Sequence, residues 1–131
     1  QVLMSHREGE PVESLSSVMN VTVVARLQEA VRTVRVDPSL YDYVLDVVAA
    51  TRASDELHVG VSPRGAISLC RAAQATALMD GRDYVVPDDV KQLAVPALAH
   101  RVISRGHLQA GNREVLETII RDLVEATPIP E

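Results

Sequence analysis

The chain has 131 residues, 47% of them hydrophobic, and its 13 basic and 18 acidic residues give a formal net charge of -5. This length fits one domain with an ordinary hydrophobic core. The negative charge disfavours nucleic-acid binding, and a chain without Phe or Trp offers few aromatic surfaces on which a base or sugar could stack.

The sequence carries no sign of export or of a membrane anchor. No apolar run approaches the roughly 20 residues that cross a bilayer, and residues 1–7 lack the basic-then-apolar order of a signal peptide. Cys70 is the only cysteine, so no internal disulfide can form, which is typical of a reducing compartment. We therefore expect a cytoplasmic protein and, because the sequence does not begin with Met, a piece of a longer one.

Residues 1–18 read as a junction. They contain Gly9, Pro11 and four serines, and predict a short helix followed by a loop. From Asn20 onward the pattern changes to an amphipathic helix, capped by Asn20 or Thr22. Its apolar stripe consists of Val23, Val24, Leu27, Val31 and Val34.

The next two helices are predicted from a capping residue followed by proline at the first helical position. Asp37 can cap a helix whose first position is Pro38 and which ends near Arg52, with Leu40 and Tyr43 among its core residues. A loop through Gly60 follows. Ser62 and Pro63 then begin a long Ala- and Leu-rich helix that Gly81 closes after Met79. Its small residues allow close helix packing, so we expect it to be central, with Ile67 in the core.

The remaining elements follow the same logic. Residues 84–86 form a short extended piece, and Pro87-Asp88-Asp89 opens a helix that reaches about Ala99. Residues 100–106 read as a loop or short strand, and a break at residues 111–112 precedes a last helix over 113–125. The sequence therefore predicts an all-α fold: a helical bundle of about five helices with little or no sheet.

Most chemical motifs are missing. There is no Gly-x-x-x-x-Gly-Lys-Ser/Thr loop to cradle phosphates, and Lys91 is the only lysine. The four histidines are too scattered to predict a metal site. Cys70 lies within a helix as a small hydrophobe, and helix capping accounts for Asp88 and Asp89. We expect no catalytic residue and no metal in this fragment.

Arg64 is the candidate binding residue. It lies in the first turn of a helix that begins at Ser62 and Pro63, where a guanidinium and free backbone N–H groups can face the same anion. An ordinary surface arginine is the alternative, at a place where positive charge is slightly unfavourable.

Several short sequence motifs, taken in this order and at this spacing, resemble those of the C-terminal lid domain of MoxR-family AAA+ ATPases. The resemblance covers residues 20–125. The most specific motifs are Gly60-Val61-Ser62-Pro63-Arg64-Gly65 and Asp80-Gly81-Arg82-Asp83-Tyr84-Val85; the others are Asp42-Tyr43-Val44, Ala50-Thr51-Arg52, Pro87-Asp88-Asp89-Val90-Lys91 and His100-Arg101. The resemblance implies that residues 19–131 form the lid and that residues 1–18 hold the end of the ATPase core or its linker.

The resemblance also implies a role for Arg64. In this family the arginine of the Ser-Pro-Arg motif is the sensor 2 residue, which reaches across the nucleotide cleft toward the phosphates of ATP. Arg64 matches it, with Ser62 and Pro63 at the helix N-terminus beside the cleft. The parent protein would use ATP and Mg2+, whereas the isolated fragment would bind neither. Arg52, His100 and Arg101 are expected to brace the lid.

The implied partners are the chain's own AAA+ core, neighbouring subunits of a ring, usually a hexamer, and proteins with von Willebrand factor A domains. Chaperone-like remodelling of other complexes is the implied activity. Without the resemblance, the residues leave open a stand-alone helical protein-interaction module, in which Arg64 has no special role. A nucleic-acid binder is disfavoured by charge.

Overall fold

A computed structural model describes residues 15–106 and 113–130. The predicted break at residues 111–112 and the predicted helix before residue 15 lie outside this range. The all-α prediction is confirmed, with a small sheet in addition. In chain order the elements are α2 (Val21–Thr33), α3 (Pro38–Ala53), β1 (Leu57–Val59), α4 (Pro63–Met79), α5 (Pro87–Leu98), the 3-10 helix η3 (Ala99–Arg101), β2 (Ile103–Ser104) and α6 (Arg113–Ala126).

The helix starts agree with the sequence. Asn20 caps α2, because its side chain accepts a hydrogen bond from the N–H of Val23 at 2.9 Å. Asp37 caps α3 in the same way, and α4 begins at Ser62 and Pro63. Gly81 has a φ of 75°, a left-handed conformation that favours glycine, directly after the end of α4.

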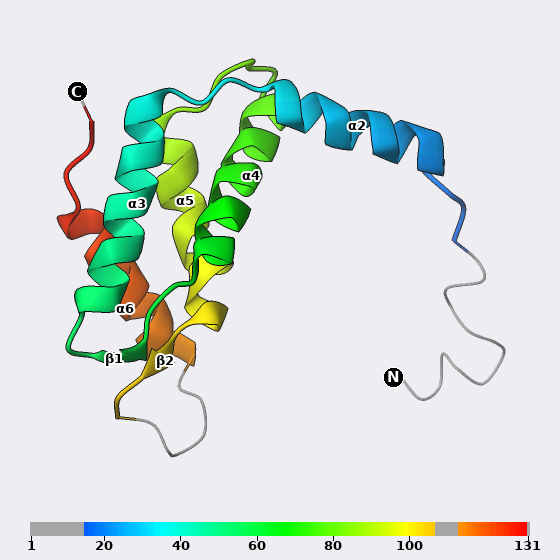
Figure 1. Cartoon of the computed structure of the whole chain (residues 1–131). Helices are drawn as coiled ribbons and strands as arrows, with labels where there is room; N and C mark the ends of the chain where they lie inside the picture. The colour runs from blue at the N-terminus through cyan, green and yellow to red at the C-terminus, as the bar shows by residue number, and fades with distance from the viewer. Residues whose placement is uncertain (1–14, 107–112, 131) are drawn as a thin grey trace, which may run out of the picture.

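The core lies between α3, α4, α5 and α6 (Figure 1). The central place predicted for α4 is shared with α5: α4 contacts α2, α3 and α5, and α5 contacts α4, α6 and η3. Ala73, Ala77 and Ala94 are fully buried, so the α4 and α5 backbones approach closely. Leu40 and Tyr43 are core residues, as predicted. The prediction for Ile67 is wrong: its side chain is 65% exposed. It lies on the face of α4 that carries Arg64 and Arg71, at i, i+3 and i+7, rather than on the face toward α5.

A two-stranded sheet takes part of the predicted loop through Gly60 and part of residues 100–106, which were predicted as a loop or short strand. Strands β1 and β2 pair antiparallel, with Leu57 opposite Ser104. The extended piece near Tyr84 also finds a partner, because Arg35 donates its N–H to the Asp83 carbonyl at 2.9 Å and Val85 donates to the Arg35 carbonyl at 3.0 Å. This bridge ties the α2–α3 connection to the α4–α5 connection.

Asp89 does more than cap α5. Its carboxylate accepts the N–H of Val86 at 2.9 Å, the capping role that was predicted, and also two guanidinium N–H groups of Arg82 at 2.7 and 2.8 Å. Arg82 bonds Asp80 as well, at 2.9 Å. Asp89 is only 4% exposed. Burial by itself raises the pKa of Asp89, but the hydrogen bonds from Arg82 and Val86 outweigh it and hold the pKa below its usual value.

Helix α2 stands apart from the bundle. It projects from the top of α4 like an arm (Figure 1), and it has no buried residue. Of its predicted apolar stripe, only the capping residue Val34 enters the core, while Val23, Val24 and Leu27 are 40%, 43% and 45% exposed. The helix is amphipathic as predicted, but its apolar face is uncovered over the described residues. None of the described helices has the length and apolarity of a membrane span.

Asp89→Ala should destabilise the fold. The substitution removes the α5 cap and leaves Arg82 without its best partner, so we expect a loss of about 1–3 kcal/mol in the free energy of unfolding at pH 7, measured with urea. Asp88→Ala is the matched control, because Asp88 is an exposed acid in the same helical turn. Equal losses in the two variants would contradict the role given to the Arg82–Asp89 pair.

The same pair predicts a pH dependence. Since the pKa of Asp89 is lower in the folded than in the unfolded chain, its contribution is present above the unfolded pKa of about 3.9 and disappears as the pH falls toward the folded value. Urea unfolding at pH 7 and in steps down to pH 3 should show a smaller acid-induced loss in Asp89→Ala than in the native chain. Parallel pH profiles for the two proteins would rule out this contribution.

Candidate functional site

The site is built at the start of α4, and α3 holds it in place. The hydroxyl of Thr51, at the end of α3, donates to the carbonyl of Val48 at 2.7 Å and accepts the N–H of Val61 at 3.0 Å. Next to it, Nε of Arg52 donates to the carbonyl of Val61 at 2.9 Å. Thr51 and Val61 are fully buried. Both backbone polar groups of Val61 are therefore fixed by α3, one residue before the cap of α4.

Two glycines allow this close packing. A Cβ at Gly60 would lie 2.8 Å from Cα of Arg52 and 2.8 Å from the carbonyl oxygen of Thr51, both backbone atoms that cannot step aside. A Cβ at Gly65 would lie 2.5 Å from Cγ1 of Val61 and 3.7 Å from a methyl group of Leu98 in α5. The turn into α4 is thus pressed against α3 on one side and α5 on the other.

Ser62, Pro63 and Arg64 lie on the outside of this turn. The Ser62 side chain accepts the N–H of Gly65 at 3.3 Å, and Pro63 takes the first helical position. Arg64 is exposed. Its carbonyl accepts a hydrogen bond from Ser68 at 2.9 Å, but its guanidinium makes no hydrogen bond or ion pair with any residue in 15–106 or 113–130. The geometry leaves the Arg64 side chain to reach outward from a helix N-terminus.

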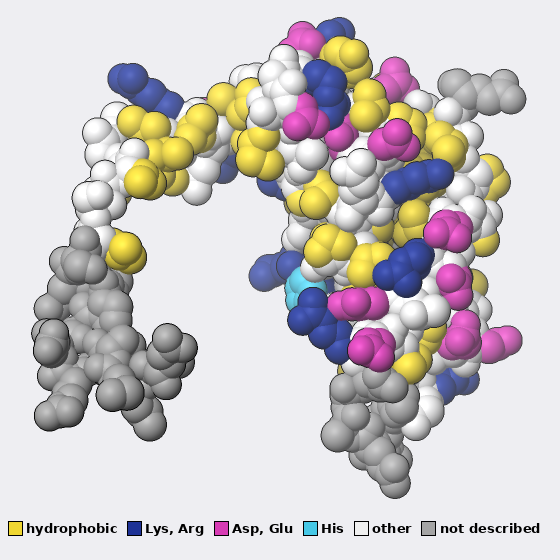
Figure 2. All heavy atoms as spheres, turned by 180° about the vertical axis from the view of Figure 1, so that it is seen from behind, with side chains coloured by type: hydrophobic (Ala, Val, Ile, Leu, Met, Phe, Trp, Pro, Cys, Tyr) yellow, Lys and Arg dark blue, Asp and Glu magenta, His cyan; other side chains and the backbone are white. Residues whose placement is uncertain are grey.

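The surroundings of Arg64 are positive. The first turn of α4 contains no acidic residue. Arg52 and Pro63 line the same shallow depression, and Cδ of Arg101 lies 3.6 Å from the position that a Cβ of Gly65 would take. Basic side chains gather beside a histidine on the face of the bundle beneath α2 (Figure 2). At the helix start Pro63 has no N–H, and Gly65 and Ala66 donate theirs to Ser62. It is therefore the positive end of the helix dipole that, together with these arginines, favours an anion.

The predicted bracing residues behave as follows. Arg52 braces the turn through Val61, and Nε of Arg101 donates to the carbonyl of Ala97 at 3.0 Å, at the end of α5. Both predictions are confirmed. For His100 the described part of the chain provides no hydrogen bond, so that prediction stays open. The role of Thr51 could not be predicted from the sequence, because its hydroxyl accepts the N–H of Val61, which lies ten residues away in a loop.

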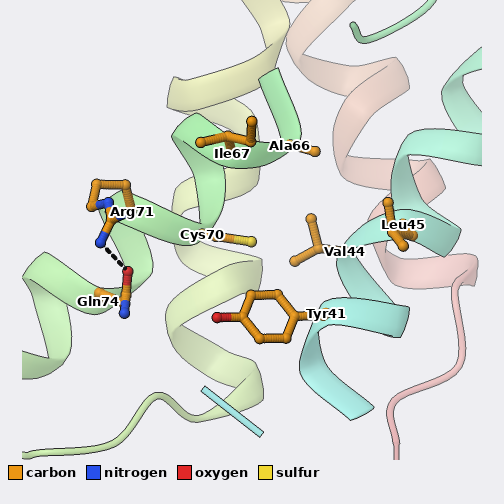
Figure 3. Close-up of a pocket in the computed structure, with 8 residues that line it drawn as sticks. All are labelled: Tyr41, Val44, Leu45, Ala66, Ile67, Cys70, Arg71 and Gln74. Atoms are coloured by element: carbon orange, nitrogen blue, oxygen red, sulfur yellow. Dashed lines mark hydrogen bonds between the residues drawn. The ribbon is translucent and has the colours of Figure 1, made fainter. Parts of the chain in front are cut away.

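A second depression lies between α3 and α4 (Figure 3). It encloses about 240 Å³, and Val44 and Cys70 face each other across it above the ring of Tyr41. Arg71 closes one side and is hydrogen-bonded to Gln74 at 3.0 Å. Burial raises the pKa of the Cys70 thiol, which stays protonated near neutral pH. This agrees with the predicted role of Cys70 as a small hydrophobe.

The described residues include no group of three or more His, Cys, Asp or Glu side chains arranged to hold a metal ion. Binding chemistry at the start of α4 therefore depends on arginine side chains and the positive end of the helix dipole. Such a set can hold a phosphate group and, by itself, offers no ligand that a divalent cation prefers.

Comparison with known proteins explains this architecture. The family model described as AAA lid domain matches residues 49–123, more than half of the chain and all of α4 and α5. The chain belongs to the AAA lid domain family. The chain is 37% identical over 129 residues to YeaC of Bacillus subtilis, a protein named as uncharacterised, and 31% identical over 139 residues to the chaperone MoxR1 of Mycobacterium tuberculosis. The predicted MoxR-type lid is thereby confirmed.

The solved structure of a protein of Cytophaga hutchinsonii, proposed to be an ATPase, superposes on the chain with a TM-score of 0.69 and 28% identity, over 90% of the chain and 39% of that protein. The matches cover 98% of the chain but 40% of YeaC, and 94% of the chain but 37% of MoxR1. The chain thus corresponds to about two fifths of each of these relatives.

Gly60→Ala should damage the site from beneath. The added methyl group would overlap backbone atoms of Thr51 and Arg52, so the turn must move, at a cost of about 1–3 kcal/mol in the free energy of unfolding. Gly106→Ala is the control, because a Cβ there meets no atom within 4 Å. Thermal unfolding of the two variants measures the difference. If Gly60→Ala were as stable as the control, the close approach would not constrain α4.

Proposed function

We propose that Arg64 is the sensor 2 arginine of a MoxR-type ATPase, and that the lid uses it to contact the phosphates of ATP held by the core of the same protein. The observation that carries this proposal is that Arg64 has no structural role within residues 60–65. The turn is packed by Gly60, Val61 and Gly65, and the helix begins at Ser62 and Pro63. The side chain of Arg64, in contrast, is exposed.

The chemistry of arginine suits this role. A guanidinium stays charged at any physiological pH, and its planar fork can hold two phosphate oxygens at once. The positive end of the α4 dipole favours the same negative charge. Since the described lid residues do not offer a cation site, Mg2+ would be held by the core domain. The lid would then swing toward the core when the terminal phosphate is present and away when it is lost.

The relatives support the wider role. One of them is named a chaperone, and we extend chaperone-like remodelling of other complexes to the parent of this lid. We also propose, from the family resemblance, that the parent uses ATP and Mg2+ and assembles into a ring, usually a hexamer, in the cytoplasm. Partner proteins with von Willebrand factor A domains belong to the same proposal. The net charge of -5 argues against nucleic acid as a substrate.

A second function has one observation in its favour. The apolar depression between α3 and α4, with Ile67 and Leu45 exposed at its edge, would suit a stand-alone helical interaction module. In that case Arg64 would carry no function. The similarity to about two fifths of longer proteins favours the lid of an ATPase over such a module.

Arg64→Ala in the full-length protein should lower ATP turnover by about 10- to 1,000-fold, as for other arginines that contact a transferring phosphoryl group. The folding of the lid should not change, because Arg64 is exposed and its guanidinium makes no hydrogen bond or ion pair with the described residues. Steady-state ATPase rates and thermal unfolding test both points. Arg121→Ala, an exposed arginine of α6, is the control. Turnover equal to that of the control would exclude the sensor role.

The lid alone should not bind nucleotide. One arginine and one helix N-terminus provide only part of a phosphate site. Titration calorimetry of the 131-residue chain with ATP and Mg2+ should give no heat of binding at chain concentrations of about 100 μM, which lies within the usual range of KM values for enzymes. A saturable signal would show that the lid holds more of the site than proposed.

A further inference from the structure

A groove runs along the surface of the bundle between α3 and α4. The depression shown in Figure 3 adjoins a second one nearer the start of α4, since Leu45 and Ala66 line both. The groove extends along α4 from Pro63 to Gln74, which are 11 positions apart. At 1.5 Å per residue this is about 16 Å, or three helical turns.

The walls of this groove are apolar and uncovered over the described residues. Leu45 of α3 is 56% exposed and Ile67 of α4 is 65% exposed, and they come from opposite walls (Figure 3). Tyr41 is also exposed, beside the half-buried Cys70. Ile67 was predicted for the core, and the fold gives it no core contact to make. Several large apolar side chains gathered along one groove are typical of a binding surface.

The groove is positively charged at both ends. Arg52 lines it beside Pro63, and Arg71 lines it at the other end. Among the described residues that line the two depressions, these two arginines are the only charged ones. Asp42 and Asp46 of α3 are exposed but line neither depression. A ligand that lies along the groove therefore meets a cation at each end.

Both arginines keep donors for a ligand. Arg52 uses Nε for the carbonyl of Val61, and Arg71 uses one terminal nitrogen for the side chain of Gln74. Neither forms an ion pair with an acid in the part of the chain that the structure describes. Their remaining N–H groups are suited to carboxylates.

We propose that the groove between α3 and α4 binds an acidic amphipathic helix of a separate protein. Its apolar stripe would pack against Leu45 and Ile67, in the way that helices commonly enter apolar grooves. Acidic residues about three turns apart would pair with Arg52 and Arg71. This inference goes beyond the proposed function and does not depend on Arg64, because the lid of an ATPase can carry such a groove as well as a stand-alone module can.

A second copy of this chain fits the groove less well than an acidic partner. Its uncovered apolar helix is α2, whose charged residues are Arg26, Glu29 and Arg32, a net charge of +1. That helix would bring like charge to the ends of the groove. Helix α6 is acidic, but its apolar side is buried in the bundle.

Two designed peptides test the preference for an acidic helix. Both have about 14 residues, with Leu at i, i+4 and i+7 in an Ala background; one carries Glu beside the Leu stripe and the other carries Lys. The Glu peptide should bind the full-length protein with a dissociation constant of about 100 μM or below. The Lys peptide should bind at least about fivefold more weakly, because it replaces two ion pairs by repulsion. Fluorescence anisotropy at low salt measures both.

Variants of the groove locate the binding. Ile67→Ser should weaken binding of the Glu peptide at least about tenfold, since it removes a large apolar contact, and should leave thermal unfolding unchanged, because Ile67 is exposed. Arg71→Ala should reduce the preference for the Glu peptide by about twofold. Ile103→Ser is the matched control, because Ile103 is 53% exposed on β2 and does not line the groove.

Other results would overturn the proposal. Equal binding of the two peptides would exclude an acidic partner, and no binding up to about 1 mM would exclude the groove as a helix site. Binding to the 131-residue chain but not to the full-length protein would assign the groove to another part of the ATPase or its ring. Self-association of the chain in sedimentation, abolished by Ile67→Ser, would assign it to a second copy.

Discussion

The close approach of the Gly60-Val61 backbone to the end of α3 is the constraint from which the rest of the site follows. Thr51 and Arg52 together occupy the N–H and the carbonyl of Val61, and Gly60 has no side chain to keep the two segments apart. A buried backbone polar group without a partner is costly, so the turn has little freedom to shift. The position and the direction of the first turn of α4 are therefore fixed. Because Arg64 lies in this turn, the position of its backbone is fixed as well.

Helix α4 connects this fixed turn to the rest of the bundle. It contacts α2, α3 and α5, and its far end is closed by Gly81 and by the ion pair of Arg82 with Asp89 at the start of α5. The bridge between Arg35 and Tyr84 joins the two connections at the same end. With both ends of α4 fixed, the bundle is suited to move as one rigid unit, which is how domain closure carries a local contact over a distance.

Two features of the described chain are left without partners, and they are informative for that reason. Buried polar side chain atoms in the described part all have hydrogen-bond partners, so the bundle is complete in itself. In contrast to these buried groups, the Arg64 guanidinium has no hydrogen-bond partner and the apolar face of α2 is uncovered in the described part of the chain.

The sequence by itself determined the helices, their caps and the type of domain. Asn20, Asp37, Ser62 and Gly81 act through bonds within a few residues or through local backbone geometry, so their roles can be predicted without a fold. Arg64 could be singled out as well, from its place behind Ser62 and Pro63 and from the resemblance, although its contact with phosphate remains a prediction.

Only the tertiary structure decided which faces are covered. Ile67 and Leu69 are similar apolar residues of one helix, yet one is exposed and the other is buried, because α5 packs against only one side of α4. The stripe of α2 looks like a core face and has no core to meet. The hydrogen bond between Thr51 and Val61 joins residues 10 positions apart. The strand pairing of Leu57 with Ser104 joins residues 47 positions apart. Such contacts depend on where other segments lie, which local periodicity does not encode.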